Sequence, residues 1–170
     1  SRLPTVALIN PDQKLPTSLR TELAYRTRLP LNLNANFRYS YARGYGLWGY
    51  YDINLDESEF ITIAPEQRPF FGDPSAIVNG SGQTTLAASR LVNTFGNVYD
   101  IRADRASSAH QITSQISGQM PKGITLSANY TLSFARDQGS GNFTSAPTAG
   151  SPNRVEWAPS NQDRRHTLNL

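Results

Sequence analysis

Acidic residues crowd the segment that follows the first long alternating run, and carboxylates in a loop can bind calcium. These residues are Asp52, Asp56, Glu57 and Glu59. Their spacing matches no defined calcium site, so we expect a solvated acidic loop. A second charged stretch, residues 100–105, mixes aspartate with arginine and favours a charged rim over a set of metal ligands.

Two histidines are the remaining candidates for metal or proton chemistry. His110 and His166 both fall in the apolar phase of an alternating run, near the start of an expected strand. A metal site or a proton relay needs a third partner, and the sequence indicates none. We therefore expect both rings to pack at the level of a membrane interface, and we expect no cofactor and no metal.

Nothing in the chain predicts catalysis. The sequence has no cysteine, no Ser-His-Asp arrangement, no carboxylate pair in phase on one strand and no glycine-rich turn that opens a helix. The net charge of +3 is spread along the chain without a basic run, which argues against nucleic-acid binding. We expect a protein that is not an enzyme.

Long runs of alternating apolar and polar residues contain or flank most of these candidate residues. From residue 18 to residue 43 the odd positions are mostly apolar and the even positions mostly polar, on both sides of Pro30. A period of two predicts pleated strands with one apolar and one polar face, here joined as an antiparallel hairpin. Residues 110–134 repeat the design around a tight turn at residues 121–123.

The length and chemistry of these runs are typical of a transmembrane barrel, in which an apolar face meets lipid and a polar face meets water. Strands of an ordinary sandwich are shorter, with about five or six residues. A hydrophobic content of 38% suits a structure that buries one face and wets the other. We expect these residues to face lipid or a protein partner: Leu33, Phe37, Tyr39, Ile112, Ile116, Leu126, Tyr130, Leu132 and Phe134.

Arginines and aromatic residues are the other candidate functional groups. The arginines Arg20, Arg26, Arg28 and Arg38 share the polar face of the first hairpin. They could line an anion path in a water-filled lumen, although pairing with Glu22 and simple solvation is the interpretation that we favour. The aromatic residues Tyr45, Trp48, Tyr50, Tyr51 and Trp157 could anchor a barrel at the membrane interface or contact a ligand at an extracellular mouth.

The whole pattern predicts an all-β chain of long antiparallel hairpins, with short turns at one end and long loops at the other. Outer-membrane barrels have this asymmetry, with short periplasmic turns and longer extracellular loops. We therefore expect a segment of an outer-membrane-type β-barrel. The expected segments are an irregular lead-in (1–16), a hairpin (17–43), a long loop (44–107), a hairpin (108–136), a long loop (137–163) and the start of a further strand (164–170).

Two stretches carry a resemblance to a known family. They are PKGITLSANYTLSFARDQGSG and PNRVEWAPSNQDRRHTLNL, and the first hairpin and GYGLWGYYDINLDES are also similar to that family's strand-to-loop segments. The sequence resembles the C-terminal barrel region of TonB-dependent outer-membrane receptors, in particular the Oar-like group with a carboxypeptidase-regulatory-like N-terminal domain. This resemblance implies a barrel of about 22 strands around a plug. It also implies uptake of a bulky ligand, driven by a TonB-type energy-coupling system.

Two hypotheses follow for the function. In the first, the chain is a fragment of such a receptor in the outer membrane of a bacterial cell envelope. In the alternative, it is a non-catalytic accessory subunit, derived from such a barrel, that docks on a larger membrane protein complex at its periplasmic face. Because the chain begins at Ser1 and ends at Leu170 within an alternating run, we expect it to be a segment of something longer.

Overall fold

The computed structural model describes residues 3–58, 60–65, 67–73, 75, 86–139, 151 and 153–170. The chain divides into two units, which are described separately. The sheet unit consists of Pro16–Leu47, Arg105–Ser140 and Trp157–Leu170. The loop unit consists of Ser1–Leu15, Trp48–Asp104 and Gly141–Glu156. In the part of the chain that the structure describes, no helix is long and apolar enough to cross a membrane.

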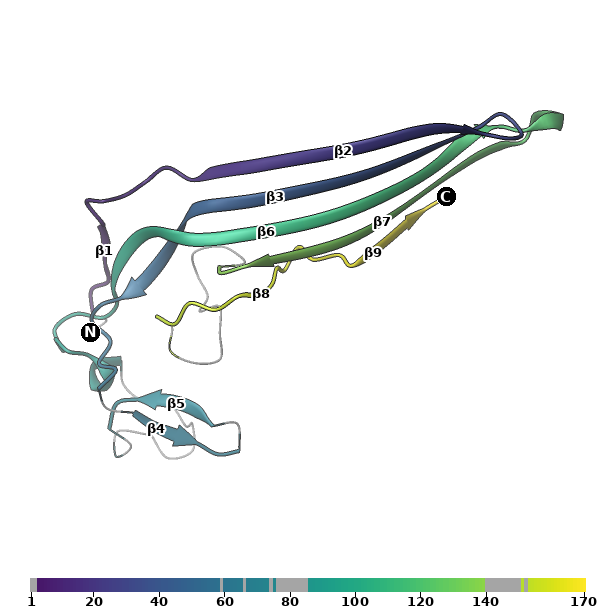
Figure 1. Cartoon of the computed structure of the whole chain (residues 1–170). Coiled ribbons are helices and arrows are strands. Elements are labelled where there is room, and N and C mark those ends of the chain that lie inside the picture. Colours follow the sequence, from purple (N-terminus) through teal and green to yellow (C-terminus); the bar gives the residue numbers. More distant parts are fainter. Residues whose placement is uncertain are drawn as a thin grey trace. The chain divides into compact units, whose positions relative to one another are not determined.

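The sheet unit is a meander whose long strands lie side by side in chain order (Figure 1). Its strands are β2 (Thr17–Leu29), β3 (Leu33–Asp52), β6 (Val98–Gln119), β7 (Thr125–Asp137), β8 (Ala158–Pro159) and β9 (His166–Asn169). The order is β2-β3-β6-β7, and both β8 and β9 pair with β7. The last residues of β3 and the first residues of β6 belong to the loop unit.

The pairing register keeps the alternation of neighbouring strands in phase. In the first hairpin Tyr25 lies opposite Phe37, while the polar Glu22 lies opposite Ser40. In the second hairpin Ile112 lies opposite Leu132 and Gln111 lies opposite Ser133. Because directly opposite residues point to the same side of a sheet, the apolar positions share one face and the polar positions share the other.

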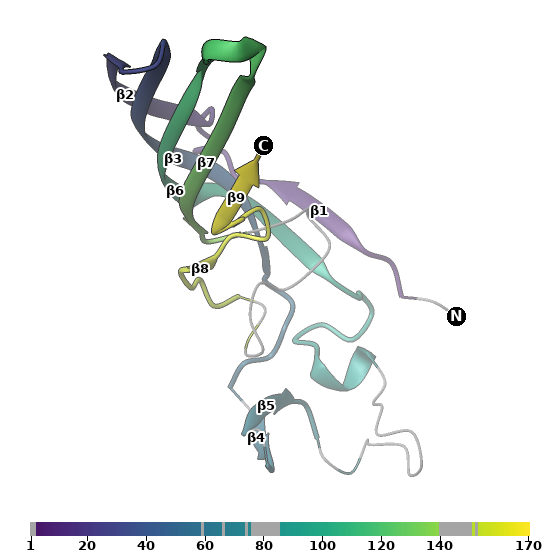
Figure 2. The same ribbon diagram turned by 90° about the vertical axis from the view of Figure 1, so that its right-hand side faces the viewer.

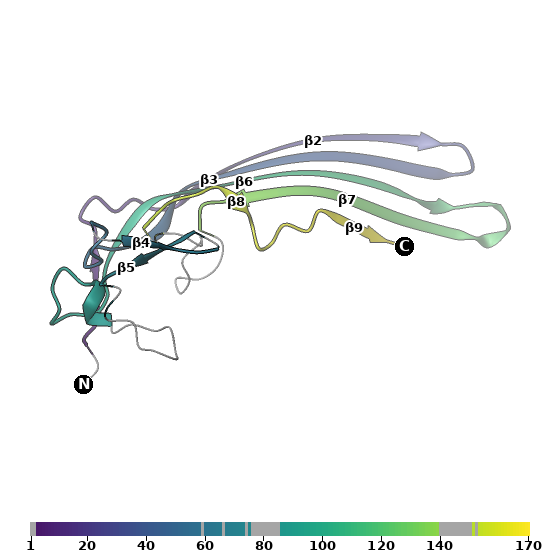
Figure 3. The same ribbon diagram turned by 90° about the horizontal axis from the view of Figure 1, so that it is seen from below.

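Two tight turns close the hairpins at the same end of the sheet (Figure 3). The turn between β2 and β3 is made possible by a positive φ at Leu31 (64°) and at Asn32 (59°). The turn η3 (Pro121–Gly123) uses Lys122 with a φ of 71°. A side chain at Gly118 would collide with the backbone of Asn32, so glycine allows β6 to approach the first turn.

The loop unit is built from short elements. The strand β1 (Val6–Ile9) pairs in parallel with the start of β6, from Val98 to Ile101. Figure 2 shows β4 (Phe60–Ile63) and β5 (Arg68–Phe71) as a small antiparallel hairpin, and η2 (Leu86–Ser89) is a single 3-10 turn. Val98 also accepts a hydrogen bond from the backbone of Ile53, so the long segment between β3 and β6 starts and ends at neighbouring points.

The described residues contain almost no apolar core. Only Ala35 and Leu55 among their hydrophobic side chains are buried. The sheet unit is a single layer, and large side chains on its apolar face stay open, with Phe37 45% and Ile112 46% exposed. A contiguous apolar surface of this kind requires a lipid or protein environment to cover it.

The strands extend further than the segments expected from the sequence. We expected a loop over 44–107, but β3 continues to Asp52 and β6 begins at Val98. Gly46 lies within β3 with a φ of 63°, a conformation that glycine adopts without cost and that is typical of a β-bulge, so the strand continues through it. The lead-in 1–16 contains β1, the loop 137–163 contains β8, and the further strand over 164–170 is β9.

Candidate functional site

The apolar face of the sheet unit is the largest candidate surface. Within each hairpin, the pairings place in one phase the residues expected on this face, which are Leu33, Phe37, Tyr39, Ile112, Ile116, Leu126, Tyr130, Leu132 and Phe134. A hydrogen bond of 2.9 Å between the Tyr39 hydroxyl and His110 Nδ1 joins the two hairpins on this side. That lipid or a protein partner covers this face stays a prediction.

Both histidines form pairs with tyrosines on the apolar face. His110 bonds to Tyr39 and packs against Tyr41, with ring centroids 4.8 Å apart. His166 Nδ1 lies 2.8 Å from the Tyr130 hydroxyl. Each pair satisfies two polar groups at once, which lowers the cost of placing them in an apolar environment. The described residues contain no group of three side chains that could hold a metal ion.

The opposite face of the first hairpin carries the expected arginines. Arg20, Arg26 and Arg28 project from β2 and are exposed, and Arg38 lies on the same face of β3. Arg38 Nε is 3.4 Å from Glu22 Oε1, with both side chains largely exposed. An exposed pair of this kind contributes at most about 1 kcal/mol, so the arginines give this face a positive charge without fixing its structure.

The expected interfacial aromatic residues belong to both units. Tyr45 and Trp157 belong to the sheet unit, whereas Trp48, Tyr50 and Tyr51 belong to the loop unit. There, Tyr50 packs edge-on against Tyr99 at 5.8 Å, and Tyr51 donates a 2.6 Å hydrogen bond to Asp104. Because β3 passes from one unit to the other just after Gly46, the five aromatic residues are divided between the units, and their role at a membrane interface stays a prediction.

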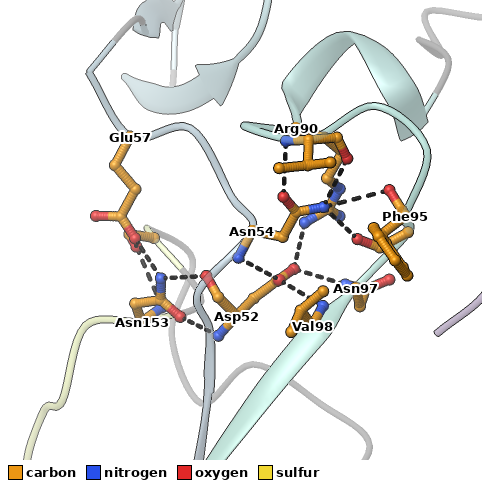
Figure 4. A network of polar contacts seen from close by, with 11 residues as sticks. Asp52, Asn54, Glu57, Arg90, Phe95, Asn97, Val98 and Asn153 are labelled. Atoms are coloured by element: carbon orange, nitrogen blue, oxygen red, sulfur yellow. Dashed lines mark hydrogen bonds and ion pairs between the residues drawn. The ribbon is translucent and has the colours of Figure 1, made fainter. Parts of the chain in front are cut away.

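Asp52, at the end of β3, is the centre of a buried polar network in the loop unit (Figure 4). Its carboxylate forms an ion pair with Arg90, and each side chain is only 4% exposed. The same carboxylate accepts hydrogen bonds from Asn97 Nδ2 (2.7 Å) and from the backbone of Val98 (3.1 Å). The expected solvated acidic loop is therefore wrong for Asp52, which lies in the interior and is neutralised by a cation.

Asn54, two residues after Asp52, forms hydrogen bonds with the segment 91–96. Its side-chain nitrogen donates to the carbonyls of Val92, Phe95 and Gly96 at 2.9–3.2 Å. Its side-chain oxygen accepts from the backbone of Val92 at 2.8 Å. One side-chain amide thus bonds to the backbone of three residues of this turn, which helps the segment 91–96 to keep its conformation with few apolar contacts. We call the Asp52 and Asn54 contacts together the loop clamp.

A third segment joins the loop clamp through Asn153. Its side-chain oxygen accepts from the backbone of Asp52 (2.7 Å), and its nitrogen donates to the Asp52 carbonyl (3.0 Å) and to Glu57 Oε1 (2.5 Å). The Ser58 hydroxyl, followed by the Ser58 backbone, donates to Asp56 and holds the pKa of that carboxyl below its usual value. These acids act as hydrogen-bond acceptors within the unit, and Glu59 lies outside the described residues.

The roles of Asn54, Arg90 and Asn153 were not predicted from the sequence. Their partners lie far away in the chain, up to 101 residues apart for Asn153 and Asp52, so no local spacing connects them. The one local signal is the sequence Asp52-Ile53-Asn54 directly after a long strand, where two short polar side chains can reach neighbouring backbone groups.

Comparison with known proteins identifies the family. A family model described as an outer membrane beta barrel domain matches residues 2–170, which is nearly the whole chain. No curated protein and no solved structure gave a match. The long alternating strands, the tight turns at one end and the uncovered apolar face are features that such a domain requires.

Proposed function

This chain belongs to the outer membrane beta barrel domain family, and we propose that it forms part of the wall of a TonB-dependent receptor that takes up a bulky ligand. Its place in the outer membrane follows from the family. The receptor type rests on the resemblance of its hairpin and loop sequences to Oar-like receptors. The ligand and the TonB-type coupling protein are the partners that this proposal implies.

The uncovered apolar face supports the proposal that the sheet lies in a membrane. Side chains such as Phe37, Ile112 and Phe134 project from one side of a single-layered sheet, and no second layer in the described structure covers them. Burying each such side chain is favourable by about 1.5–3 kcal/mol relative to leaving it in water. Lipid supplies this burial to every strand at once, as a wall of a barrel requires.

The polar face of the first hairpin and the open edge of β2 support the proposal that the chain is part of a larger barrel. The arginines Arg20, Arg26 and Arg28 lie on the face that would line the lumen, where they would favour anionic ligands. Within the described sheet, β2 pairs with β3 alone, so its other edge is available to a further strand. A β-strand edge in a membrane must be paired because lipid offers it no hydrogen bonds.

The proposal is tested on the whole membrane protein that contains this chain. After detergent extraction it should retain the purified periplasmic domain of a TonB-type protein, used as the probe, in a saturable manner. A porin-type barrel extracted from the same membrane is the matched control and should retain none. Failure of the whole protein to retain the probe, together with an intact mass near 18.8 kDa, would contradict the receptor and favour an accessory subunit.

A further inference from the structure

Two arginines lie on the apolar face where its stripe ends toward the long loops. The guanidinium carbon of Arg43 on β3 is 5.0 Å from the ring centroid of Trp157 and 5.5 Å from that of Tyr45. Arg136 on β7 donates a 3.2 Å hydrogen bond from Nη2 to the Trp157 carbonyl. Trp157 therefore contacts both cations, one through its ring and the other through its backbone.

Ser108 on β6 lies between the two arginines. It pairs with Arg136 in the register of β6 and β7. A Cβ at Gly44 would be 2.5 Å from Ser107 Oγ, so Gly44 lies beside Ser107 and the neighbouring Arg43 lies beside Ser108. Because adjacent strands are about 4.8 Å apart, the backbones of Arg43 and Arg136 are about 10 Å apart. Two long side chains can thus converge above a small hydroxyl residue.

Neither arginine has an acidic partner among the described residues. Other arginines of the chain do, for example Arg102 with Asp100 at 2.7 Å and Arg165 with Asp163 at 2.8 Å. An arginine without a counter-charge is costly inside the hydrocarbon of a membrane. It is stabilised at the headgroup level, where phosphate oxygens can accept two parallel hydrogen bonds from one guanidinium group.

Arg43, Ser108 and Arg136 lie side by side on three strands, and we call them the arginine row. The position of this row along the strands matches the headgroup level of the membrane. From Leu33 to Arg43 the strand advances ten residues, and β-strands rise about 3.3 Å per residue. With a tilt of about 40°, this advance corresponds to about 25 Å along the membrane normal, which is the height of the apolar band of outer-membrane barrels. The row therefore lies at the outer limit of this band, on the side of the long loops.

We propose that Arg43, Ser108 and Arg136 bind the phosphate of an anionic lipid headgroup in the outer leaflet. The two guanidinium groups supply the charge and paired donors, the Ser108 hydroxyl supplies a further donor, and Trp157 orients Arg43. This inference rests on the proposed lipid contact of the apolar face and is independent of TonB coupling. Lipid A carries phosphate groups at the membrane surface and is therefore a suitable probe for this site.

The test compares paired substitutions in the whole protein, reconstituted in nanodiscs that contain lipid A and phosphatidylcholine. The variant R43Q/R136Q should retain lipid A at least about tenfold more weakly in native mass spectrometry, because charged hydrogen bonds are lost. The matched control R20Q/R28Q removes the same charge from the opposite face and should retain lipid A as the wild type does. Addition of inorganic phosphate at millimolar concentration should not release the lipid.

The results separate this inference from the proposed function. Heat-modifiable electrophoresis first confirms that each variant forms a barrel. Equal lipid A retention by wild type and R43Q/R136Q would overturn the inference, as would an equal loss in R20Q/R28Q or release of the lipid by inorganic phosphate. A wild-type protein that fails to enter the membrane would instead contradict the lipid-facing wall.

Discussion

The sheet unit and the loop unit keep their structures by opposite means. The sheet unit repeats one simple pattern over long strands and leaves its apolar face uncovered, so its stability depends on the surrounding medium. The loop unit has little regular structure and is held by buried polar groups around Asp52 and Asn54. A membrane wall can thus be encoded by a local sequence pattern, whereas a folded loop needs specific partners that lie far away in the chain.

The largest expected effect comes from removing the centre of the loop clamp. Substitution D52N leaves Arg90 buried without its counter-charge, which should destabilise the loop unit by about 3–5 kcal/mol. Limited proteolysis and hydrogen exchange should show the segment 86–98 opening, while heat-modifiable mobility shows an intact barrel. The exposed D12N serves as the control variant, and an unchanged protease pattern in D52N would refute the clamp.

A smaller effect is expected when a charge is placed on the apolar face. Substitution I112R should destabilise the inserted barrel by about 2–4 kcal/mol if the site lies near the membrane midplane. T113R, the next residue, points to the polar face and should be tolerated. Urea unfolding of the protein in lipid vesicles measures both variants. Equal losses in the two would show that the faces of β6 are not distinguished by their surroundings.

The smallest expected effect concerns the exposed ion pair of the sheet unit. Substitution E22Q removes the partner of Arg38, and because both side chains are largely exposed, the loss should be below about 1 kcal/mol. The same urea titration measures it. Comparing the loss of stability in E22Q with that in D52N separates the two units, since the ion pair of Glu22 is exposed and that of Asp52 is buried. A loss in E22Q as large as that in D52N would abolish this distinction.

Alternation made the faces of the sheet predictable. A period of two assigns each residue from Leu19 to Tyr41 to a side, and the pairing of β2 with β3 and of β6 with β7 keeps these sides. The strand ends were less predictable, because the positive φ of Gly46 lets β3 continue past the point where the alternation changes phase. Local patterns cannot reveal such a continuation.

The loop clamp could not be predicted for a different reason. Asp52 meets Arg90, Asn97 and Asn153 only after the chain has folded back twice, and each partner has an unremarkable local sequence. Acidic residues near the end of a strand predict solvated carboxylates more readily than a buried ion pair. The arginine row was missed similarly, since Arg43 and Arg136 become neighbours only through the pairing of β6 with its two flanking strands.

The central claim is that the two faces of the sheet meet lipid and water. The most direct test introduces single cysteines at residues 111–117 of β6, since the chain has no cysteine of its own, and attaches a spin label to each in the whole protein in lipid vesicles. We predict a period of two, with residues 112, 114 and 116 accessible to oxygen and residues 111, 113, 115 and 117 accessible to a water-soluble nickel complex. Uniform accessibility along the strand, or the opposite phase, would contradict it.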